Sequence, residues 1–146
     1  MVVKKSMRRV VVFGAYDPLH PGHLYFLTEA RKHGEHLTVV VARDESIYSF
    51  KKREPYLGLE ARVQALIDTG IPDKVLPGNL PGRRFDLLRS LEFDVLALGY
   101  DQEPSDREVA RLLLVAGKNA VEIVRVAPFY PEKYKSTLVR EMQKGL

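Results

Sequence analysis

Hydrophobic and polar positions fall into two kinds of block along this chain. The first kind is a short, continuous apolar run rich in β-branched residues. Between these runs, apolar residues recur at spacings of three and four, which is the period of an amphipathic helix. The apolar runs are Val10–Phe13, Leu37–Ala42, the shorter Val75–Leu76, Val95–Leu98 and Val121–Val126. The pattern predicts an α/β protein whose strands alternate with helices, and such strands are typical of a parallel sheet.

Glycine and proline mark the predicted helix boundaries. A helical pattern that starts after Pro21 stops at Gly34, and the stripe over residues 59–67 stops at Gly70 and Pro72. Further helical patterns cover Phe85–Leu91, Val109–Ala116 and a segment that begins near Ser136, whereas Arg43–Leu57 and Pro77–Arg84 are the longest predicted loops. We therefore predict one domain over residues 1–146, with a doubly wound, parallel, five-stranded sheet and helices on both faces.

A strand, a glycine-containing turn and a helix start meet within the stretch Gly14–His23, which reads Gly-Ala-Tyr-Asp-Pro-Leu-His-Pro-Gly-His. With Pro21 as the first helical residue, His20 falls at the N-cap and His23 at the third helical position. The amides of the first helical turn, those of Gly22 and His23 among them, lack intrahelical partners and form an anion site with the macrodipole. Ser, Thr, Asp or Asn would be the ordinary cap. The histidines are either surface residues beside a turn or additional donors to a bound phosphate, and this context favours the donors.

The predicted topology brings a second turn to the same place. In an open parallel sheet, ligands bind beyond the carboxyl ends of the strands, at the point where the strand order reverses. Gly14–His20 leaves the first predicted strand at that edge, and Gly99–Gln102 leaves the fourth. The two turns are therefore expected to face each other across one crevice.

Composition excludes several classes of site. The chain has 146 residues, a net charge of +4 and no cysteine, which excludes disulfides, thiolate catalysis and cysteine-ligated zinc. It contains no P-loop motif and no G-x-S-x-G elbow. The positive charge favours anionic ligands, but the basic residues are scattered in pairs without the stripe that a nucleic-acid partner requires. No apolar run approaches the ~20 residues that span a bilayer, and no signal-peptide pattern is present. We expect a cytoplasmic protein without a membrane or nucleic-acid partner.

His20-Pro21-Gly22-His23 resembles the H-x-G-H signature of the nucleotidyltransferase superfamily that includes cytidylyltransferases, pantetheine-phosphate adenylyltransferase and the archaeal FAD synthetases. Three further matches follow in the family's order. They are Lys51–Tyr56 with Glu60-Ala61-Arg62 (a lysine-containing stretch and an E-x-R helix start), Leu98–Gln102 (a G-Y-D-Q turn) and Lys135–Glu141 (an I-S-S-T-x-x-R helix start). The resemblance runs roughly from Arg9 to Glu141 and implies a Rossmann-like fold. Lys135 departs from the pattern, since a small or apolar residue usually precedes the Ser/Thr pair.

The resemblance implies nucleotidyl transfer, in which an anionic acceptor attacks the α-phosphorus of a nucleoside triphosphate and pyrophosphate departs. For such a reaction the protein positions the groups and neutralises the growing charge. The expected catalytic residues are His20, His23, Lys51 and Lys52. Mg²⁺ is expected with ATP or CTP as substrate and without dedicated protein ligands. The resemblance also implies a homodimer.

The remaining expected contacts divide between the two substrates. The expected nucleotide-binding residues are Gly14, Ala15, Tyr16, Asp17, Gly22, Gly99, Asp101, Gln102, Ser136, Thr137 and Arg140, and Arg62 is expected to reach a phosphate on the acceptor. Some of these positions have a second interpretation. Asp17 is alternatively a plain turn aspartate, and Arg62 alternatively forms a pair on its own helix. Asp101 and Gln102 alternatively form an ordinary β-turn.

The acceptor is less clearly indicated than the reaction. The segments Leu98–Gln102 and Asp73–Val75 look most like archaeal FAD synthetases, so FMN adenylylation is favoured over the cytidylylation of glycerol-3-phosphate. A flavin would need an apolar slot. Candidates for that slot are Tyr48, Phe50 and Tyr56, or Phe129 and Tyr130. Two hypotheses from other classes are a non-catalytic nucleotide sensor and a nucleic-acid-binding module.

Overall fold

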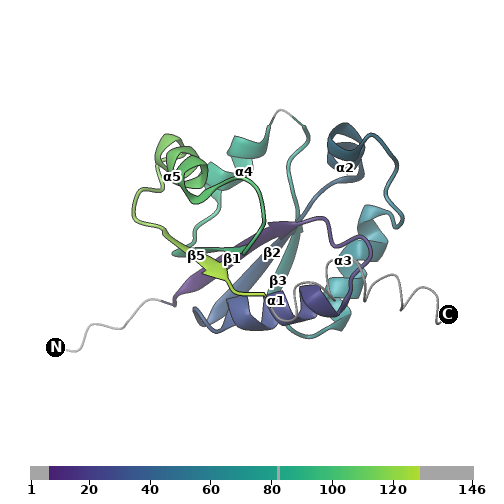
Figure 1. Cartoon of the computed structure of the whole chain (residues 1–146), viewed down its shortest axis with the longest axis horizontal. Coiled ribbons are helices and arrows are strands. Elements are labelled where there is room, and N and C mark those ends of the chain that lie inside the picture. The colour runs from purple at the N-terminus through teal and green to yellow at the C-terminus, as the bar shows by residue number, and fades with distance from the viewer. Residues whose placement is uncertain (1–6, 82, 129–146) are drawn as a thin grey trace.

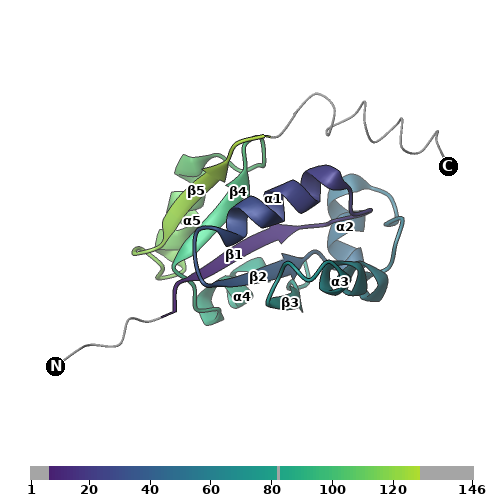
Figure 2. The ribbon, with the colours of Figure 1, turned by 90° about the horizontal axis from the view of Figure 1, so that it is seen from below.

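The computed structural model describes residues 7–81 and 83–128. Its centre is a parallel sheet (Figure 1) with the strand order β3-β2-β1-β4-β5, which can be followed in Figure 2. The strands are β1 (Arg9–Gly14), β2 (His36–Val41), β3 (Lys74–Pro77), β4 (Val95–Gly99) and β5 (Glu122–Val126). The chain winds outward from β1 to β3, returns to the centre, and winds outward again through β4 and β5. This is the predicted doubly wound, Rossmann-like sheet, and its strand order reverses between β1 and β4.

Helices cover both faces of the sheet, as predicted. The helices are α1 (Pro21–Arg31), α2 (Asp44–Lys51), α3 (Leu59–Asp68), α4 (Arg84–Ser90) and α5 (Asp106–Val115). Helices α1 and α3 lie on one face, and α4 and α5 lie on the other (Figures 1 and 2). None of the helices within the described part of the chain is long and apolar enough to cross a membrane.

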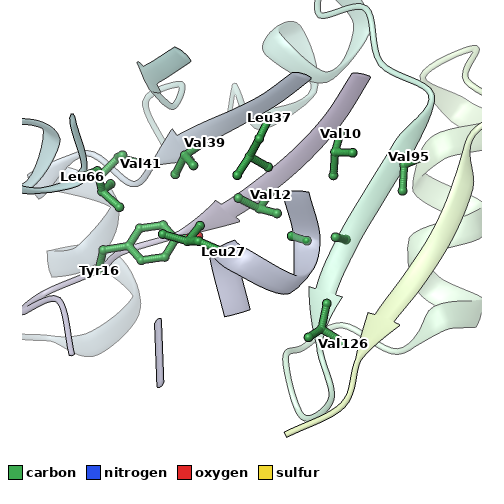
Figure 3. Packing of buried hydrophobic residues seen from close by; sticks show 12 residues of the cluster. Val10, Val12, Tyr16, Leu27, Leu37, Val39, Val41, Leu66, Val95 and Val126 are labelled. Carbon is green, nitrogen blue, oxygen red and sulfur yellow. The ribbon is translucent and has the colours of Figure 1, made fainter. Parts of the chain in front are cut away.

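The core consists of two hydrophobic clusters, one on each face of the sheet. On one face, Val10 and Val12 of β1 pack with Leu27 of α1 and Leu66 of α3 (Figure 3). Val11, which lies between them in the sequence, points to the opposite cluster and to α5. All five of these side chains are completely buried. Because a slip of one residue would exchange the two faces of β1, this burial fixes the register of the sheet.

The predicted loop Arg43–Leu57 is wrong over its first half, because it contains helix α2. Ile47 is the buried residue of this helix, so no apolar stripe appears in the sequence. Two acidic residues stand in its first turn and Lys51 in its last, a charge distribution that suits the helix macrodipole. The helix ends at Lys52, whose φ of 59° is left-handed. The helix predicted to start near Ser136 lies outside the described residues.

Candidate active site

A cleft opens at the carboxyl edge of the sheet, where β1 and β4 separate. The two strands are paired at Val10–Val95 and Val11–Leu96 and diverge beyond these positions, whereas β1 pairs with β2 along its whole length. The cleft has a volume of about 610 Å³. The predicted site residues that line it are Gly14, Ala15, Tyr16, His20, Gly22, His23, Lys51, Gly99, Asp101 and Gln102. The structure thus brings the two predicted turns together on one crevice.

The two histidines form a stacked pair at the start of α1. Their ring centroids lie 3.7 Å apart with an interplanar angle of 26°. His20 is the N-cap residue, as predicted, and its Nδ1 accepts the amide N–H of Gly22 at 3.0 Å. The Nδ1 of His23 accepts the amide N–H of His20 at 3.3 Å, which completes a capping box built from two imidazoles.

One sequence prediction about this helix start is wrong. The amides of Gly22 and His23 are not free, because Gly22 donates to the His20 ring and the His23 amide donates to the His20 carbonyl at 2.9 Å. The histidines therefore cap the helix themselves. An anion at this helix start would therefore meet the outer edges of the two imidazole rings rather than free backbone amides.

Both histidines are neutral donors at neutral pH. Since each Nδ1 accepts a hydrogen bond, the proton of the neutral ring is assigned to Nε2. Burial lowers the pKa of His20. Burial also lowers the pKa of His23 to about 3, with smaller contributions from the charges of His20 and Lys51. The pair thus presents Nε2–H groups that can donate to phosphate oxygens.

Tyr16 forms both the wall of the cleft and a part of the core. The residue has a left-handed φ of 53° and is 4% exposed, and its ring meets that of His23 edge-on at 5.1 Å. The side chain lies among Val12, Leu27 and their neighbours (Figure 3). Its buried hydroxyl has no hydrogen-bond partner among the described residues, and burial raises its pKa. A Cβ at Gly14 would lie 2.9 Å from the ring, so a side chain at this position would have to displace the ring.

Asp17 does not line the cleft. Its carboxylate accepts the amide N–H groups of Tyr56 and Leu57, each at 2.8 Å, and its side chain is 2% exposed. Arg53 lies 3.8 Å from the same carboxylate. The predicted contact between Asp17 and the nucleotide therefore has no support in this geometry. The contacts of Asp17 are to the segment that follows α2.

Arg62 is also outside the cleft, although the sequence suggested that it binds the acceptor. Its side chain is completely buried. The guanidinium donates to the carbonyls of Leu57 at 2.8 Å, Ala15 at 3.1 Å and Ala42 at 2.6 Å, and it pairs with Asp44 at 2.6 Å. These bonds occupy all three guanidinium nitrogens within the protein. Arg62 forms neither the predicted acceptor contact nor a pair on its own helix.

The side chain of Gln102 bridges the gap between the diverging strands. Its Nε2 donates to the carbonyl of Phe13 at 2.9 Å, and its Oε1 accepts the amide N–H of Gly99 at 3.1 Å. The carboxamide replaces the main-chain ladder that β1 and β4 no longer make. The predicted β-turn is present as well, since the amide of Gln102 donates to the Gly99 carbonyl at 3.1 Å.

Sequence reasoning missed Arg125, which organises the turn after β4. From β5 its guanidinium donates to the carbonyls of Gly99, Gln102 and Pro104 at 2.6–2.7 Å and pairs with Asp106 at 2.5 Å. The available signal was an arginine inside the apolar run Val121–Val126. Part-buried arginine in a strand needs several acceptors, and the exposed carbonyls of a neighbouring turn supply them.

Three aromatic residues of the cleft were also missed, namely Phe13, Tyr25 and Phe26. Together with Tyr100 they form an aromatic wall of the cleft. The signal was present for Tyr25 and Phe26, which lie two and three residues after His23 in the first turns of α1. The aromatic residues suggested for a flavin slot in or near α2 lie elsewhere: Tyr48, Phe50 and Tyr56 are 53%, 85% and 71% exposed and are not cleft residues.

Two groups of predictions are not tested by this geometry. Ser136, Thr137 and Arg140, together with Phe129 and Tyr130, lie outside the described residues. Lys51 and Lys52 are both exposed, and of the two Lys51 lines the cleft. Among residues 7–81 and 83–128, no group of three or more His, Cys, Asp or Glu side chains is arranged to hold a metal ion.

Comparison with known proteins places this geometry in a family. The family model described as cytidylyltransferase-like matches residues 11–142. An FAD synthase of Methanosarcina barkeri is 37% identical over 126 residues, which cover 84% of this chain and 88% of that protein. An FAD synthase of Korarchaeum cryptofilum is 38% identical over 141 residues, which cover 94% and 92%.

A solved structure agrees with these relatives. The lipopolysaccharide core biosynthesis protein of Thermoplasma volcanium superposes with a TM-score of 0.78 at 30% identity, over 85% of this chain and 99% of that one. The matched region contains the stacked histidines, the cleft and both turns that line it. The chain therefore belongs to the cytidylyltransferase-like family of nucleotidyltransferases.

Proposed function

We propose that the chain is an FMN adenylyltransferase, which transfers AMP from ATP to the phosphate of FMN and releases pyrophosphate. The observation that carries the transfer chemistry is the stacked pair of neutral histidines, which lines the cleft together with Lys51. The relatives from Methanosarcina barkeri and Korarchaeum cryptofilum are FAD synthases, and this supports FMN as the acceptor.

The proposed reaction is an in-line displacement at the α-phosphorus. An oxygen of the FMN phosphate forms a new P–O bond as the bond between the α-phosphorus and the bridging oxygen breaks, and the electron pair leaves with pyrophosphate. Negative charge is redistributed over the phosphate oxygens during the step. The Nε2–H groups of His20 and His23 donate to those oxygens, and the Lys51 ammonium offsets the charge. Because both rings are already neutral, each donates a hydrogen bond from Nε2–H and keeps its proton during the step.

The aromatic wall supports a flavin acceptor. Phe13, Tyr25, Phe26 and Tyr100 contribute to one cleft, and pockets for planar ring systems are lined mainly by apolar and aromatic side chains. ATP and FMN each contain such a ring system. A small acceptor such as glycerol-3-phosphate has no use for this surface.

We propose that Mg²⁺ arrives as part of the MgATP substrate. Among the described cleft residues Asp101 is the single carboxylate, beside the imidazoles of His20 and His23 and the ammonium of Lys51, whereas Mg²⁺ prefers several oxygen ligands and commonly keeps phosphates and water. The residues present therefore do not fit a dedicated magnesium site of the protein. Homodimer formation and a cytoplasmic location remain predictions from the sequence.

A second candidate is CTP:glycerol-3-phosphate cytidylyltransferase, an activity compatible with the match to the cytidylyltransferase-like family model. One assay separates the candidates. The protein is incubated with Mg²⁺ and either ATP or CTP, each with FMN, glycerol-3-phosphate, phosphocholine or phosphopantetheine, and pyrophosphate is measured. We expect release with ATP and FMN, accompanied by FAD. Release confined to CTP with glycerol-3-phosphate would establish the second candidate, and nucleotide binding without release would indicate a sensor.

The histidine pair gives the first mutational test. We expect His20→Ala and His23→Ala each to lower turnover by ~10²–10³-fold, the usual loss for one transition-state donor. The exposed His33, beyond the end of α1, provides the matched control, and His33→Ala should retain wild-type turnover. Wild-type turnover in both cleft variants would remove the pair from the chemistry.

A further inference from the structure

We propose that Asp17 is a positioning residue that fastens the lysine segment, defined as residues 52–58, and thereby places Lys51 at the cleft. The proposal rests on the proposed function in one respect, namely that Lys51 acts on the transferred phosphate. It differs from the sequence prediction, in which Asp17 contacts the nucleotide itself.

The contacts of Asp17 all lead to the lysine segment. Its two oxygens accept separate hydrogen bonds, Oδ1 from the Leu57 amide and Oδ2 from the Tyr56 amide, each at 2.8 Å. Oδ2 also lies 3.8 Å from the guanidinium of Arg53. Since the carboxylate is 2% exposed, it is shielded from water and its charge-assisted bonds are correspondingly strong. A carboxylate engaged in this way has both oxygens directed at residues 53–57.

Both backbone polar groups of Leu57 are hydrogen-bonded to buried side chains. Its amide donates to Asp17, and its carbonyl accepts a bond of 2.8 Å from the buried guanidinium of Arg62. The same guanidinium holds the carbonyl of Ala15, two residues before Asp17, at 3.1 Å. The end of the lysine segment is therefore tied to the turn after β1, about forty residues away in the sequence.

The start of the lysine segment follows Lys51 directly. Lys52 closes α2 in a left-handed conformation, and its amide donates to the Tyr48 carbonyl at 2.8 Å. Three cations, Lys51, Lys52 and Arg53, stand in a row here. Their mutual repulsion favours a more open segment, and the Asp17 carboxylate supplies an opposing charge. Arg53 in turn covers the ring of Tyr56, with its guanidinium carbon 4.3 Å from the ring centroid.

The position of Lys51 depends on these contacts because Lys51 is the last residue of α2 and directly precedes the lysine segment. Its side chain lines the cleft, and its charge is one cause of the lowered pKa of His23. If the segment is released, the last turn of α2 loses its anchor and the ammonium loses its fixed place beside the histidines. A displacement of about 1 Å in a catalytic group can cost ~10²-fold in rate.

Activity measurements test the coupling between Asp17 and Lys51. The variants are Asp17→Ala, Asp17→Asn, Lys51→Ala and the double variant of Asp17→Ala with Lys51→Ala. We expect Asp17→Ala to lower kcat by ~10²-fold. The double variant should be no slower than the slower single variant, because a residue that acts through Lys51 has nothing left to position. Asp17→Asn should lie between wild type and Asp17→Ala, since an amide keeps one acceptor oxygen.

Asp73→Asn is the matched control. Asp73 also accepts a backbone amide, that of Leu37 at 2.9 Å, and pairs with Arg31. It lies at the opposite edge of the sheet, just before β3. A loss of the same kinds of contact there should leave kcat unchanged.

Limited digestion with trypsin supplies a readout that needs no substrate. Trypsin cleaves after lysine and arginine, and we expect the fastened segment to resist cleavage after Lys51, Lys52 and Arg53. We expect cleavage at these sites to be at least about tenfold faster in Asp17→Ala than in wild type, with Asp73→Asn unchanged; a released segment opens more often. Wild-type cleavage in Asp17→Ala would overturn the proposal, and so would losses that multiply in the double variant. If no acceptor yields pyrophosphate, the proposed function fails while the digestion still decides whether Asp17 fastens the segment.

Discussion

Each imidazole of the cleft pair has two distinct tasks, one for each ring nitrogen. The Nδ1 atoms of His20 and His23 cap α1, and the protonated Nε2 atoms remain for a ligand. The spacing H-x-G-H was sufficient to predict the N-cap and the helix start. It could not predict that the Gly22 amide is consumed by the cap, because that depends on the rotamer of a neighbouring side chain.

The lowered pKa of His23 makes the fold sensitive to acid. In the unfolded chain His23 has its ordinary pKa of 6.5, whereas in the folded chain its pKa is about 3. Between these two pH values the unfolded chain therefore binds a proton at His23 that the folded chain does not bind. The free energy of unfolding is therefore highest above pH 6.5 and falls as the pH decreases, by up to about 1.4 kcal/mol per pH unit from this group. Urea unfolding between pH 7 and pH 4 should show a shallower fall in His23→Asn. The same slope in both proteins would contradict the expectation, and His33→Asn serves as the control.

The buried hydroxyl of Tyr16 gives an opposite kind of prediction, since its removal should stabilise the protein. An unpartnered buried polar group costs about 1–3 kcal/mol, and this hydroxyl has no partner among the described residues. Tyr16→Phe should raise the free energy of unfolding by about 1 kcal/mol or more, measured by urea unfolding. Tyr56→Phe, which removes a hydroxyl from a side chain that is 71% exposed, should leave it unchanged. Destabilisation by Tyr16→Phe would show that the hydroxyl has a partner in solution.

Helices and strands with a regular hydrophobic pattern were predictable from the sequence, and helix α2, which lacks such a pattern, was not. The strands and α1, α3 and α5 follow from apolar runs, helical stripes, Gly34 and Gly70, because their burial repeats with a regular period. Helix α2 was missed because Ile47 alone gives no period. The convergence of the turns after β1 and β4 followed from topology. The cleft positions of Phe13, Tyr25 and Phe26 did not, since the sequence does not show whether an aromatic side chain faces a cleft or the core.

Where β1 and β4 diverge, the sheet depends on a side chain. Gln102→Ala removes both bonds of the carboxamide bridge and leaves the Phe13 carbonyl and the Gly99 amide without that partner. We expect the free energy of unfolding to fall by about 1–3 kcal/mol. Gln64→Ala, which removes an exposed bond within α3, should cost no more than about 0.5 kcal/mol. Equal effects of the two substitutions in thermal unfolding would show that the bridge contributes nothing.

On the scale of the molecule, a single buried arginine joins segments that are distant in the sequence. Arg62 connects the turn after β1, the end of β2 and the end of the lysine segment through the carbonyls of Ala15, Ala42 and Leu57. The sequence showed the E-x-R motif, but it could not distinguish a buried clamp from a phosphate ligand, because both use the same donors. The contacts that decide between these roles span 20 and 47 residues.

Substitution of Arg62 tests this assignment. Removal of one partner from a buried charged network costs about 3–5 kcal/mol, so Arg62→Ala should lower the free energy of unfolding by about 3 kcal/mol or more. Arg111→Ala, on the exposed face of α5, should change it by no more than about 0.5 kcal/mol. If Arg62→Ala keeps wild-type stability and instead raises the KM for the acceptor, the sequence interpretation is right and the clamp is not.

The close contact between Gly14 and the ring of Tyr16 has a consequence for how the protein can vary. The ring occupies the space that a methyl group at position 14 would need, and it is packed in the core cluster that contains Val12 and Leu27. The two positions therefore behave as one mutational unit. A larger residue at position 14 becomes tolerable only after the residue at position 16 has shrunk, so the order in which the substitutions arise decides whether an evolutionary path stays open.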